Sequence, residues 1–180
     1  MRNNTILSLS IIFILLGSAS ISLKAQGEKI NLSTFTFTVP DGMTHHPNNP
    51  EVLAKLSFEK SLHITIDNNM EKMLELTKKR PKGKERTEME QMAFDLKFES
   101  IQKQYRGYDP TKKQSGTLKT YNYTTQMFTC KASKTQEAYL EYRVMEIGGK
   151  HYEFIITGKK EAKKKHLPLI KNFWKSIVVN

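Results

Sequence analysis

Two adjacent histidines, His45 and His46, are the residues whose type and spacing most directly suggest chemistry. Imidazole binds transition metals and transfers protons near neutral pH. Adjacent residues of an extended chain point in opposite directions, and no other histidine, cysteine or carboxylate stands at a recognised metal-ligand spacing from this pair. We therefore expect an exposed pair in an irregular loop and predict no metal or other cofactor. The alternative is an envelope hydrolase or metal-dependent enzyme that uses the His45-His46 loop.

The other reactive side chains stand outside any recognised catalytic motif. Cys130 is the only cysteine, so no intramolecular disulfide can form, and the sequence places no histidine partner near it. The chain has no Gly-x-Ser-x-Gly motif, no phosphate-binding glycine loop and no His-Glu-x-x-His motif. His63 and His151 alternate with apolar residues and are expected on the surface. We predict no catalytic residues, and we interpret Cys130 as an inert packed thiol.

Positive charge concentrates in two runs, residues 78–86 and 159–165, in a chain of formal net charge +11 at pH 7. Lysine dominates both runs, so they attract anions without the planar fork that arginine offers to phosphate. A solvated surface is the plainer interpretation of such runs. The more specific interpretation is a binding surface for an anionic envelope component or an acidic protein, and nucleic acid is disfavoured as a partner. The predicted contact residues are Lys78, Lys79, Arg80, Lys82, Lys84, Lys159, Lys160, Lys163, Lys164 and Lys165.

The first 25 residues have the pattern of a secretory signal peptide. A basic start is followed by an uncharged apolar run over residues 6–19, and Ala25 precedes the favoured cleavage point. Earlier cleavage and an uncleaved anchor stay open as alternatives. The remaining residues, 26–180, form one predicted domain of net charge +9, because the signal segment carries two basic residues and no acid. We expect an exported periplasmic or extracellular protein without a transmembrane span, and the lack of disulfides favours a bacterial envelope.

Strands are predicted in the N-terminal part of this domain. Phenylalanines and threonines alternate over residues 31–40, which predicts one strand with a buried face. Residues 52–58 fit either a strand or a helix, whereas residues 62–66 alternate as a half-buried strand does. The two runs together most simply form a hairpin.

Two helices are predicted in the middle of the chain. Aspartate and asparagine residues before residue 70 offer N-caps for a helix over residues 70–78. A second helix is predicted over residues 87–104, because Thr87 and Glu90 form a capping box. Residues 94–105 also alternate in polarity, so a strand stays open there, although the capped start favours the helix.

The C-terminal part begins with a predicted loop over residues 106–116 and a Thr- and Tyr-rich strand over residues 118–131. Alternating runs over residues 138–145 and 152–156 flank Gly148-Gly149. A two-glycine turn between such runs is a strong hairpin signal.

A C-terminal helix is predicted from about His166 to Ile177, because apolar residues recur three, four and seven positions apart. Pro168 fits the first turn of that helix. We interpret Trp174 as a packing anchor. A short closing strand is expected over residues 176–179.

Three short segments resemble the PsbP-like and DcrB-like proteins. Residues 35–43 (FTFTVPDGM) resemble their opening strand, residues 170–177 (IKNFWKSI) resemble their closing signature, and Gly149-Lys150-x-Tyr152 fits their hairpin. The resemblance implies an α+β fold with a central antiparallel sheet flanked by helices, an α/β/α sandwich. It also implies a non-catalytic accessory or binding protein, because these families share no active site. We therefore expect an exported soluble binding or accessory protein with a basic surface for an anionic partner.

Overall fold

The structure is a computed structural model that describes residues 27–47, 52–76 and 83–180. The predicted signal peptide lies outside these ranges. Four of the predicted contact residues also lie outside them: Lys78, Lys79, Arg80 and Lys82.

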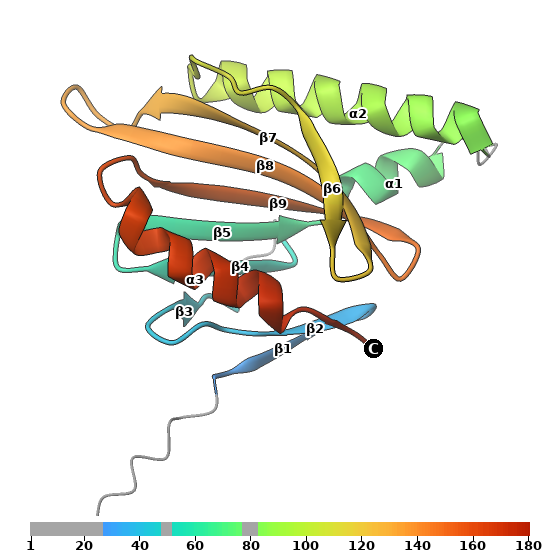
Figure 1. Cartoon of the computed structure of the whole chain (residues 1–180), viewed down its shortest axis with the longest axis horizontal. Helices are drawn as coiled ribbons and strands as arrows, with labels where there is room; N and C mark the ends of the chain where they lie inside the picture. The colour runs from blue at the N-terminus through green and yellow to red at the C-terminus, as the bar shows by residue number, and fades with distance from the viewer. Residues whose placement is uncertain (1–26, 48–51, 77–82) are drawn as a thin grey trace, which may run out of the picture.

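A seven-stranded antiparallel sheet forms the centre of the fold (Figure 1). Its strands are β3 Thr44–His45, β4 Ala54–Phe58, β5 Leu62–Asp67, β6 Gln114–Leu118, β7 Tyr121–Lys131, β8 Glu137–Ile147 and β9 Lys150–Lys159. They lie side by side in the order β3-β4-β5-β9-β8-β7-β6. Strands β8 and β9 are in the middle and bury most of their side chains on both faces.

Helices cover both faces of this sheet. Helices α1, Asn69–Leu76, and α2, Gly83–Gln104, pack on one face, whereas α3, Lys163–Ser176, packs on the other (Figure 1). The layers confirm the predicted α+β sandwich with a central antiparallel sheet. No helix in the described part of the chain is both long enough and apolar enough to cross a membrane.

A second, three-stranded sheet corrects the prediction of one strand over residues 31–40. It consists of β1 Lys29–Leu32, β2 Phe35–Thr38 and β10 Val178–Val179, in the order β1-β2-β10. Leu32 pairs with Phe35 across a two-residue turn. Leu32 and Phe35 have opposite parity in the sequence, so a single straight strand would point them to opposite faces. The turn lets both residues contact the same core. The expected closing strand is confirmed as β10.

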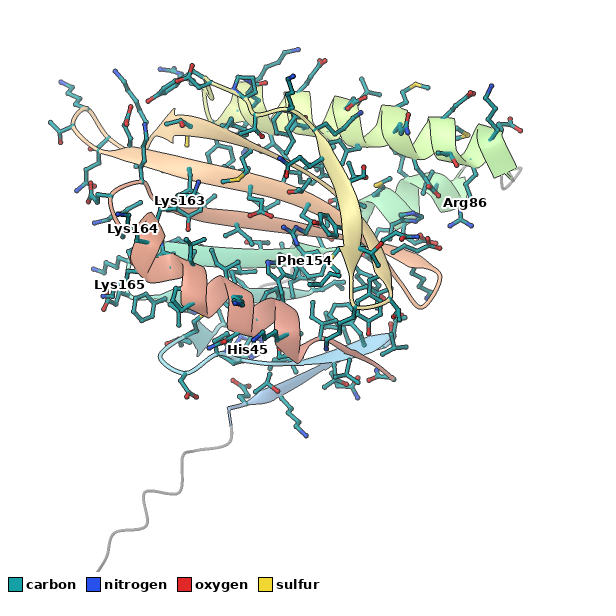
Figure 2. The ribbon with its side chains drawn as sticks, in the orientation of Figure 1. His45, Arg86, Phe154, Lys163, Lys164 and Lys165 are labelled. Carbon is teal, nitrogen blue, oxygen red and sulfur yellow. The ribbon has the colours of Figure 1, made fainter. Side chains whose placement is uncertain are left out.

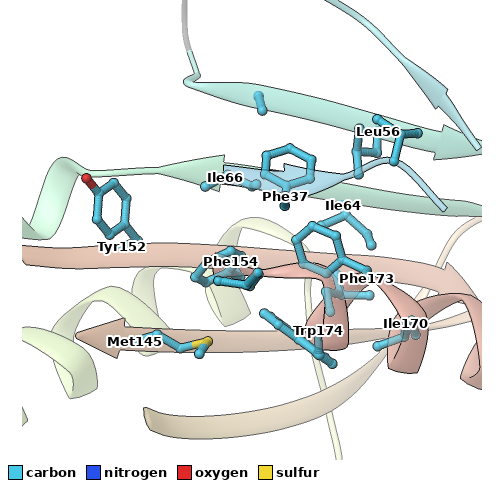
Figure 3. Packing of buried hydrophobic residues seen from close by; sticks show 14 of the residues in the cluster. Phe37, Leu56, Ile64, Ile66, Met145, Tyr152, Phe154, Ile170, Phe173 and Trp174 are labelled. Carbon is cyan, nitrogen blue, oxygen red and sulfur yellow. The ribbon is translucent and has the colours of Figure 1, made fainter. Parts of the chain in front are cut away.

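Aromatic rings fill the core between α3 and the sheets (Figure 3). The Phe154 ring lies 5.0 Å from that of Trp174, and Phe37 lies 5.4 Å from Phe173, both edge to face. Edge-to-face pairs at this separation stabilise a core beyond the burial of their area. Trp174 is 6% exposed, which confirms its role as a packing anchor.

A separate apolar cluster lies under α1 and α2 on the opposite face of the sheet. The Phe94 ring lies 5.0 Å from that of Tyr142 in a tilted arrangement, and the Phe98 ring lies 5.7 Å from that of Phe128, edge to face. The buried residues Phe94, Phe98 and Ile101 have helical spacing. Residues 94–104, for which the sequence also allowed a strand, are therefore part of helix α2. Cys130 is buried in this cluster, and burial raises the pKa of its thiol, which confirms a packed cysteine.

Helix α2 begins at Gly83, four residues before the predicted N-cap. Thr87 is inside the helix, where its hydroxyl donates a hydrogen bond to the Gly83 carbonyl at 3.3 Å. A threonine hydroxyl can bond to the carbonyl one turn earlier as readily as it caps a helix. The capping-box position was therefore wrong, whereas the predicted end at Gln104 is confirmed.

Both predicted hairpins are confirmed. Strands β4 and β5 pair as expected, and β8 pairs with β9 around Gly148-Gly149, both with positive φ angles. The predicted loop over residues 106–116 was too long, because Gln114 to Leu118 form the edge strand β6. The β6–β7 turn includes Lys119 with a φ of +56°. Glycine is the usual signal for a hairpin turn with positive φ, and its absence here explains why the turn was not predicted.

Helix α3 also begins earlier than predicted. The Lys163 amide donates to the Lys160 carbonyl at 3.2 Å, and the His166 amide donates to Ala162 at 3.0 Å. Lysine is a good helix former, so the three lysines before His166 extend the helix by a turn. Pro168 consequently lies inside the helix and not in its first turn.

Candidate functional site

Five of the predicted contact lysines lie together where β9 ends and α3 begins. Lys159 ends β9, Lys160 follows it, and Lys163, Lys164 and Lys165 form the first turn of α3. These five residues are called the α3 lysine cluster below. Lys160 Nζ contacts Glu137 at 2.8 Å and Lys165 Nζ contacts Glu59 at 3.0 Å, so two of the ammonium groups are already paired.

The described part of the first basic run, residues 83–86, does not share a surface with the α3 lysine cluster. Figure 2 shows Lys163, Lys164 and Lys165 at one end of the molecule and Arg86 at the other. Lys84 is in the first turn of α2 with Arg86 and pairs with Glu88 at 3.6 Å. Any anionic partner of the α3 lysine cluster therefore contacts a surface separate from that of Lys84.

The start of α3 is electrostatically unusual. Its first turn contains three lysines and no acidic residue, and Ala162 at the N-cap position provides no side-chain hydrogen bond. The N-terminus of a helix carries a partial positive charge, so cations there are normally disfavoured. This end of α3 is complementary to an anion, whose charge would offset both the lysines and the helix dipole.

His45 and His46 do not form a metal site with other described residues. His45 is in strand β3, not in a loop, and its Nδ1 lies 3.1 Å from Glu28 Oε1. The His45 side chain is only 10% exposed, so the expectation of an exposed pair was wrong for this residue. His46 is exposed and its Nε2 lies 2.7 Å from Ser57 Oγ. Within the described ranges, no three His, Cys, Asp or Glu side chains are placed to hold one metal ion.

His151 is buried, which corrects the prediction of a surface histidine. It is 4% exposed because its face of β9 lies under α1 and α2 and not in solvent. Its Nδ1 is 3.0 Å from Glu71 Oε2, and its Nε2 is 3.2 Å from Glu90 Oε1. A neutral imidazole has one N–H group, so both contacts are hydrogen bonds only when the ring carries two protons.

Arg86 extends these contacts into a charge network. Its Nε donates to Glu90 Oε1 at 2.6 Å, and one terminal nitrogen lies 3.4 Å from Glu146 Oε1. The hydrogen bond to Glu90 is the main reason why the pKa of Arg86 is raised. Glu71, Arg86, Glu90, Glu146 and His151 are called the His151 network below. It joins α1, α2, β8 and β9, and none of its members was predicted as a site residue.

The His151 network borders a cleft of about 460 Å³ between α2 and the sheet, called the α2 cleft below. Glu90, Glu146 and His151 line one part of it. The rest of the lining combines hydroxyl and amide side chains with apolar side chains, so that polar and apolar surface contribute about equally: Met70, Thr87, Gln91, Phe94, Ser115, Gly116, Thr117, Asn122, Tyr123, Thr124 and Val144. Small-molecule sites are commonly concave and of this size.

His166 forms a second buried polar group, on the α3 side of the sheet. Its Nε2 lies 3.0 Å from Ser61 Oγ, and its Nδ1 lies 3.1 Å from the Tyr139 hydroxyl. Ser61 Oγ also donates to the Phe58 carbonyl at 3.3 Å. Both ring nitrogens of His166 and both hydroxyl groups have hydrogen-bond partners when the Tyr139 hydroxyl donates to His166 Nδ1 and the His166 Nε2–H donates to Ser61 Oγ. Ser61 is then an acceptor from histidine, which is opposite to the direction in an activated serine nucleophile.

Replacing His166 by phenylalanine is expected to lower the free energy of unfolding at pH 7 by about 1–3 kcal/mol, since it leaves the buried Tyr139 hydroxyl without its partner. Burial, and secondarily Lys165, lowers the pKa of His166 below 6.5. The stability contributed by the neutral ring is therefore present above about pH 6.5 and is lost as the pH falls through the folded-state pKa.

Thermal unfolding at pH 7 and pH 5 tests this expectation. The difference between the wild type and H166F should shrink at pH 5, whereas the exposed His46→Gln should match the wild type at both values. An unchanged difference between the two pH values would contradict the assignment of a neutral buried ring.

The comparisons with known proteins support the fold. No family model matches the chain, and no curated protein matches it. The solution structure of cyanobacterial PsbP (CyanoP) from Synechocystis sp. PCC 6803 is similar with a TM-score of 0.55 and 13% identity, covering 92% of this chain and 99% of CyanoP. The crystal structure of LpqN, involved in cell envelope biogenesis of Mycobacterium tuberculosis, has a TM-score of 0.51 and 8% identity, covering 86% and 85%. The chain therefore has a PsbP-like α+β fold.

Proposed function

We propose that the protein is an exported, non-catalytic accessory protein that binds an anionic partner in the cell envelope through the α3 lysine cluster. The observation that carries the proposal is the first turn of α3, with three lysines, no acid and no side-chain cap. Such a turn is stabilised when an anion binds to it, because the anion offsets both the lysine charges and the helix dipole.

Two further observations agree with a place in the envelope. The N-terminal 25 residues have the sequence pattern of a signal peptide. One protein with the same fold, LpqN, is involved in cell envelope biogenesis. A lysine-rich surface on an exported protein would attract the anionic lipids and polymers of the envelope, and salt would weaken this attraction.

Replacing Lys163, Lys164 and Lys165 together by glutamine is expected to weaken binding to phosphatidylglycerol vesicles about 100-fold at low ionic strength. Each lysine near an anionic surface contributes about 1 kcal/mol, and three such contributions correspond to roughly that factor. Co-sedimentation with phosphatidylglycerol and phosphatidylcholine vesicles measures the effect. Beads that carry polyglutamate serve as a second probe for an acidic protein.

A matched control replaces the exposed lysines Lys29, Lys72 and Lys103 by glutamine, which changes the net charge equally. It should weaken binding much less than the variant at α3 does. Equal losses in the two triple variants would mean that net charge alone drives binding. Failure of the wild type to bind either anionic probe at low salt would also overturn the proposal.

A further inference from the structure

The α2 cleft is a separate feature from the α3 lysine cluster. It lies between the N-terminal half of α2 and the face of the sheet that carries Val144 and His151. Its volume of about 460 Å³ falls within the range of small-molecule sites. The lining of the cleft indicates which chemical class of molecule would fit it.

The charged part of the lining excludes anions and favours hydrogen-bond donors. Arg86 contacts one oxygen of Glu90 and one oxygen of Glu146, so each carboxylate keeps an oxygen with no partner among the described residues. Carboxylates accept hydrogen bonds and repel other anions. A molecule that enters the cleft must therefore bring donors, such as hydroxyl groups, to this wall.

The opposite wall is neutral and polar. Ser115 Oγ contacts Thr124 Oγ1 at 3.2 Å, and Thr117 donates to Asn122 Oδ1 at 3.4 Å. These pairs leave the Asn122 amide nitrogen without a hydrogen bond to any described residue. On α2, the Gln91 side chain is exposed and likewise makes no hydrogen bond within the described part of the chain. Amides of this kind donate to and accept from neighbouring hydroxyl groups.

We propose that the α2 cleft binds a small polyhydroxylated molecule of the saccharide type that carries no acidic group. Vicinal hydroxyls would donate to the free oxygens of Glu90 and Glu146 and would bond to the Asn122 amide. The C–H face of a sugar ring would lie on the small apolar area that Met70 and Val144 contribute. An apolar ligand would bury the polar walls without partners, which carries a free-energy penalty.

Titration of the purified protein with cellobiose, glucosamine and glucuronate, followed by backbone amide chemical shifts, tests the proposal. Cellobiose or glucosamine should shift amides of β6, β7 and the first half of α2. Tighter binding of glucosamine would assign the ligand to the amino sugars, and tighter binding of cellobiose to the neutral sugars. Glucuronate should bind more weakly than both, because its carboxylate meets Glu90 and Glu146.

Asn122→Ala and Glu146→Gln should each weaken binding about five- to tenfold, which corresponds to the loss of one or two net hydrogen bonds. Gln114→Ala is the matched control, because Gln114 is exposed on the same β6–β7 hairpin but points to the other face of the sheet. Thermal unfolding verifies that the variants remain folded. Absence of shifts around the cleft with all three sugars, glucuronate binding as tightly as cellobiose, or variants that bind like the wild type would each overturn the proposal. None of these outcomes depends on the α3 lysine cluster.

Discussion

Replacing Phe154 by alanine is expected to lower the free energy of unfolding by about 3–5 kcal/mol, the range measured when a buried phenylalanine is truncated. Phe154 is fully buried in β9, and its ring lies 5.0 Å from Trp174 and 6.0 Å from Phe173. The ring also lies 6.3 Å from Phe35 in β2. Its removal would thus leave a cavity where α3, the large sheet and the small sheet meet.

Equilibrium denaturation in urea measures this change, and two controls define its origin. Phe154→Leu keeps most of the volume and should cost clearly less than the alanine variant. Leu167→Ala removes a side chain that is 54% exposed on α3 and should change stability by no more than about 0.5 kcal/mol. A loss below about 1 kcal/mol for F154A would contradict the packing of α3 on β9, because cavities in cores carry larger penalties.

The elements that the sequence predicted well are those whose signal is local. The Gly148-Gly149 hairpin needs only two alternating runs and a turn, and all of them lie within about twenty consecutive residues. The apolar stripe of α3 and the buried spacing of Phe94, Phe98 and Ile101 are local in the same sense. Boundaries were less accurate, because Thr87 and Pro168 each fit more than one position within a helix turn.

The α2 cleft and the His151 network beside it could not be predicted in this way, since their residues come from distant segments. Glu71 and His151 are 80 positions apart, and Arg86 and Glu146 are 60 positions apart. Nothing in the local pattern around any of them indicates a partner. His151 shows the same limitation. Alternation placed it on the polar side of its strand, but two helices cover that side, and His151 contacts Glu71 and Glu90 there.

The lysine runs illustrate a further limit of sequence reasoning. Composition correctly identified where basic residues concentrate, yet it could not indicate whether the two runs share a surface. Only the fold shows that the start of α2 and the start of α3 lie at opposite ends of the molecule (Figure 2). The sequence also did not predict that lysines occupy the uncapped first turn of α3, because the helix was expected to begin three residues later.

Replacing Glu153 by glutamine is expected to raise the free energy of unfolding at pH 7 by about 1–3 kcal/mol, because it removes a buried carboxylate charge and keeps an oxygen in place. Glu153 is 2% exposed, and the Tyr142 hydroxyl donates to its Oε1 at 3.0 Å. Asp67, itself buried, lies directly opposite in the β5–β9 register. The glutamine oxygen can still accept from Tyr142, and its amide can donate to Asp67.

The pH dependence of this stabilisation follows from the direction of the pKa shift. Burial chiefly raises the pKa of Glu153 above 4.5, and the charge of Asp67 adds to the effect, although Lys97 and Tyr142 oppose it. The folded protein therefore keeps this proton at pH values where the unfolded chain has released it. Stability that the protonated carboxyl contributes is present below about pH 4.5 and is lost as the pH rises through the folded-state pKa.

The difference between E153Q and the wild type should accordingly be small near pH 4 and grow until the folded-state pKa has been passed. Thermal unfolding at intervals between pH 4 and pH 8 measures it, and titrating groups that do not interact with Glu153 cancel in the difference. Glu161→Gln, at an exposed position before α3, should show no such trend. A difference that is constant with pH would mean that folding leaves the pKa of Glu153 unchanged, which would contradict the raised pKa in the folded protein. A variant that is less stable than the wild type at neutral pH would mean that the folded protein stabilises the ionised carboxylate, as the charge of Lys97 does, so the sign of the change decides between the two arrangements.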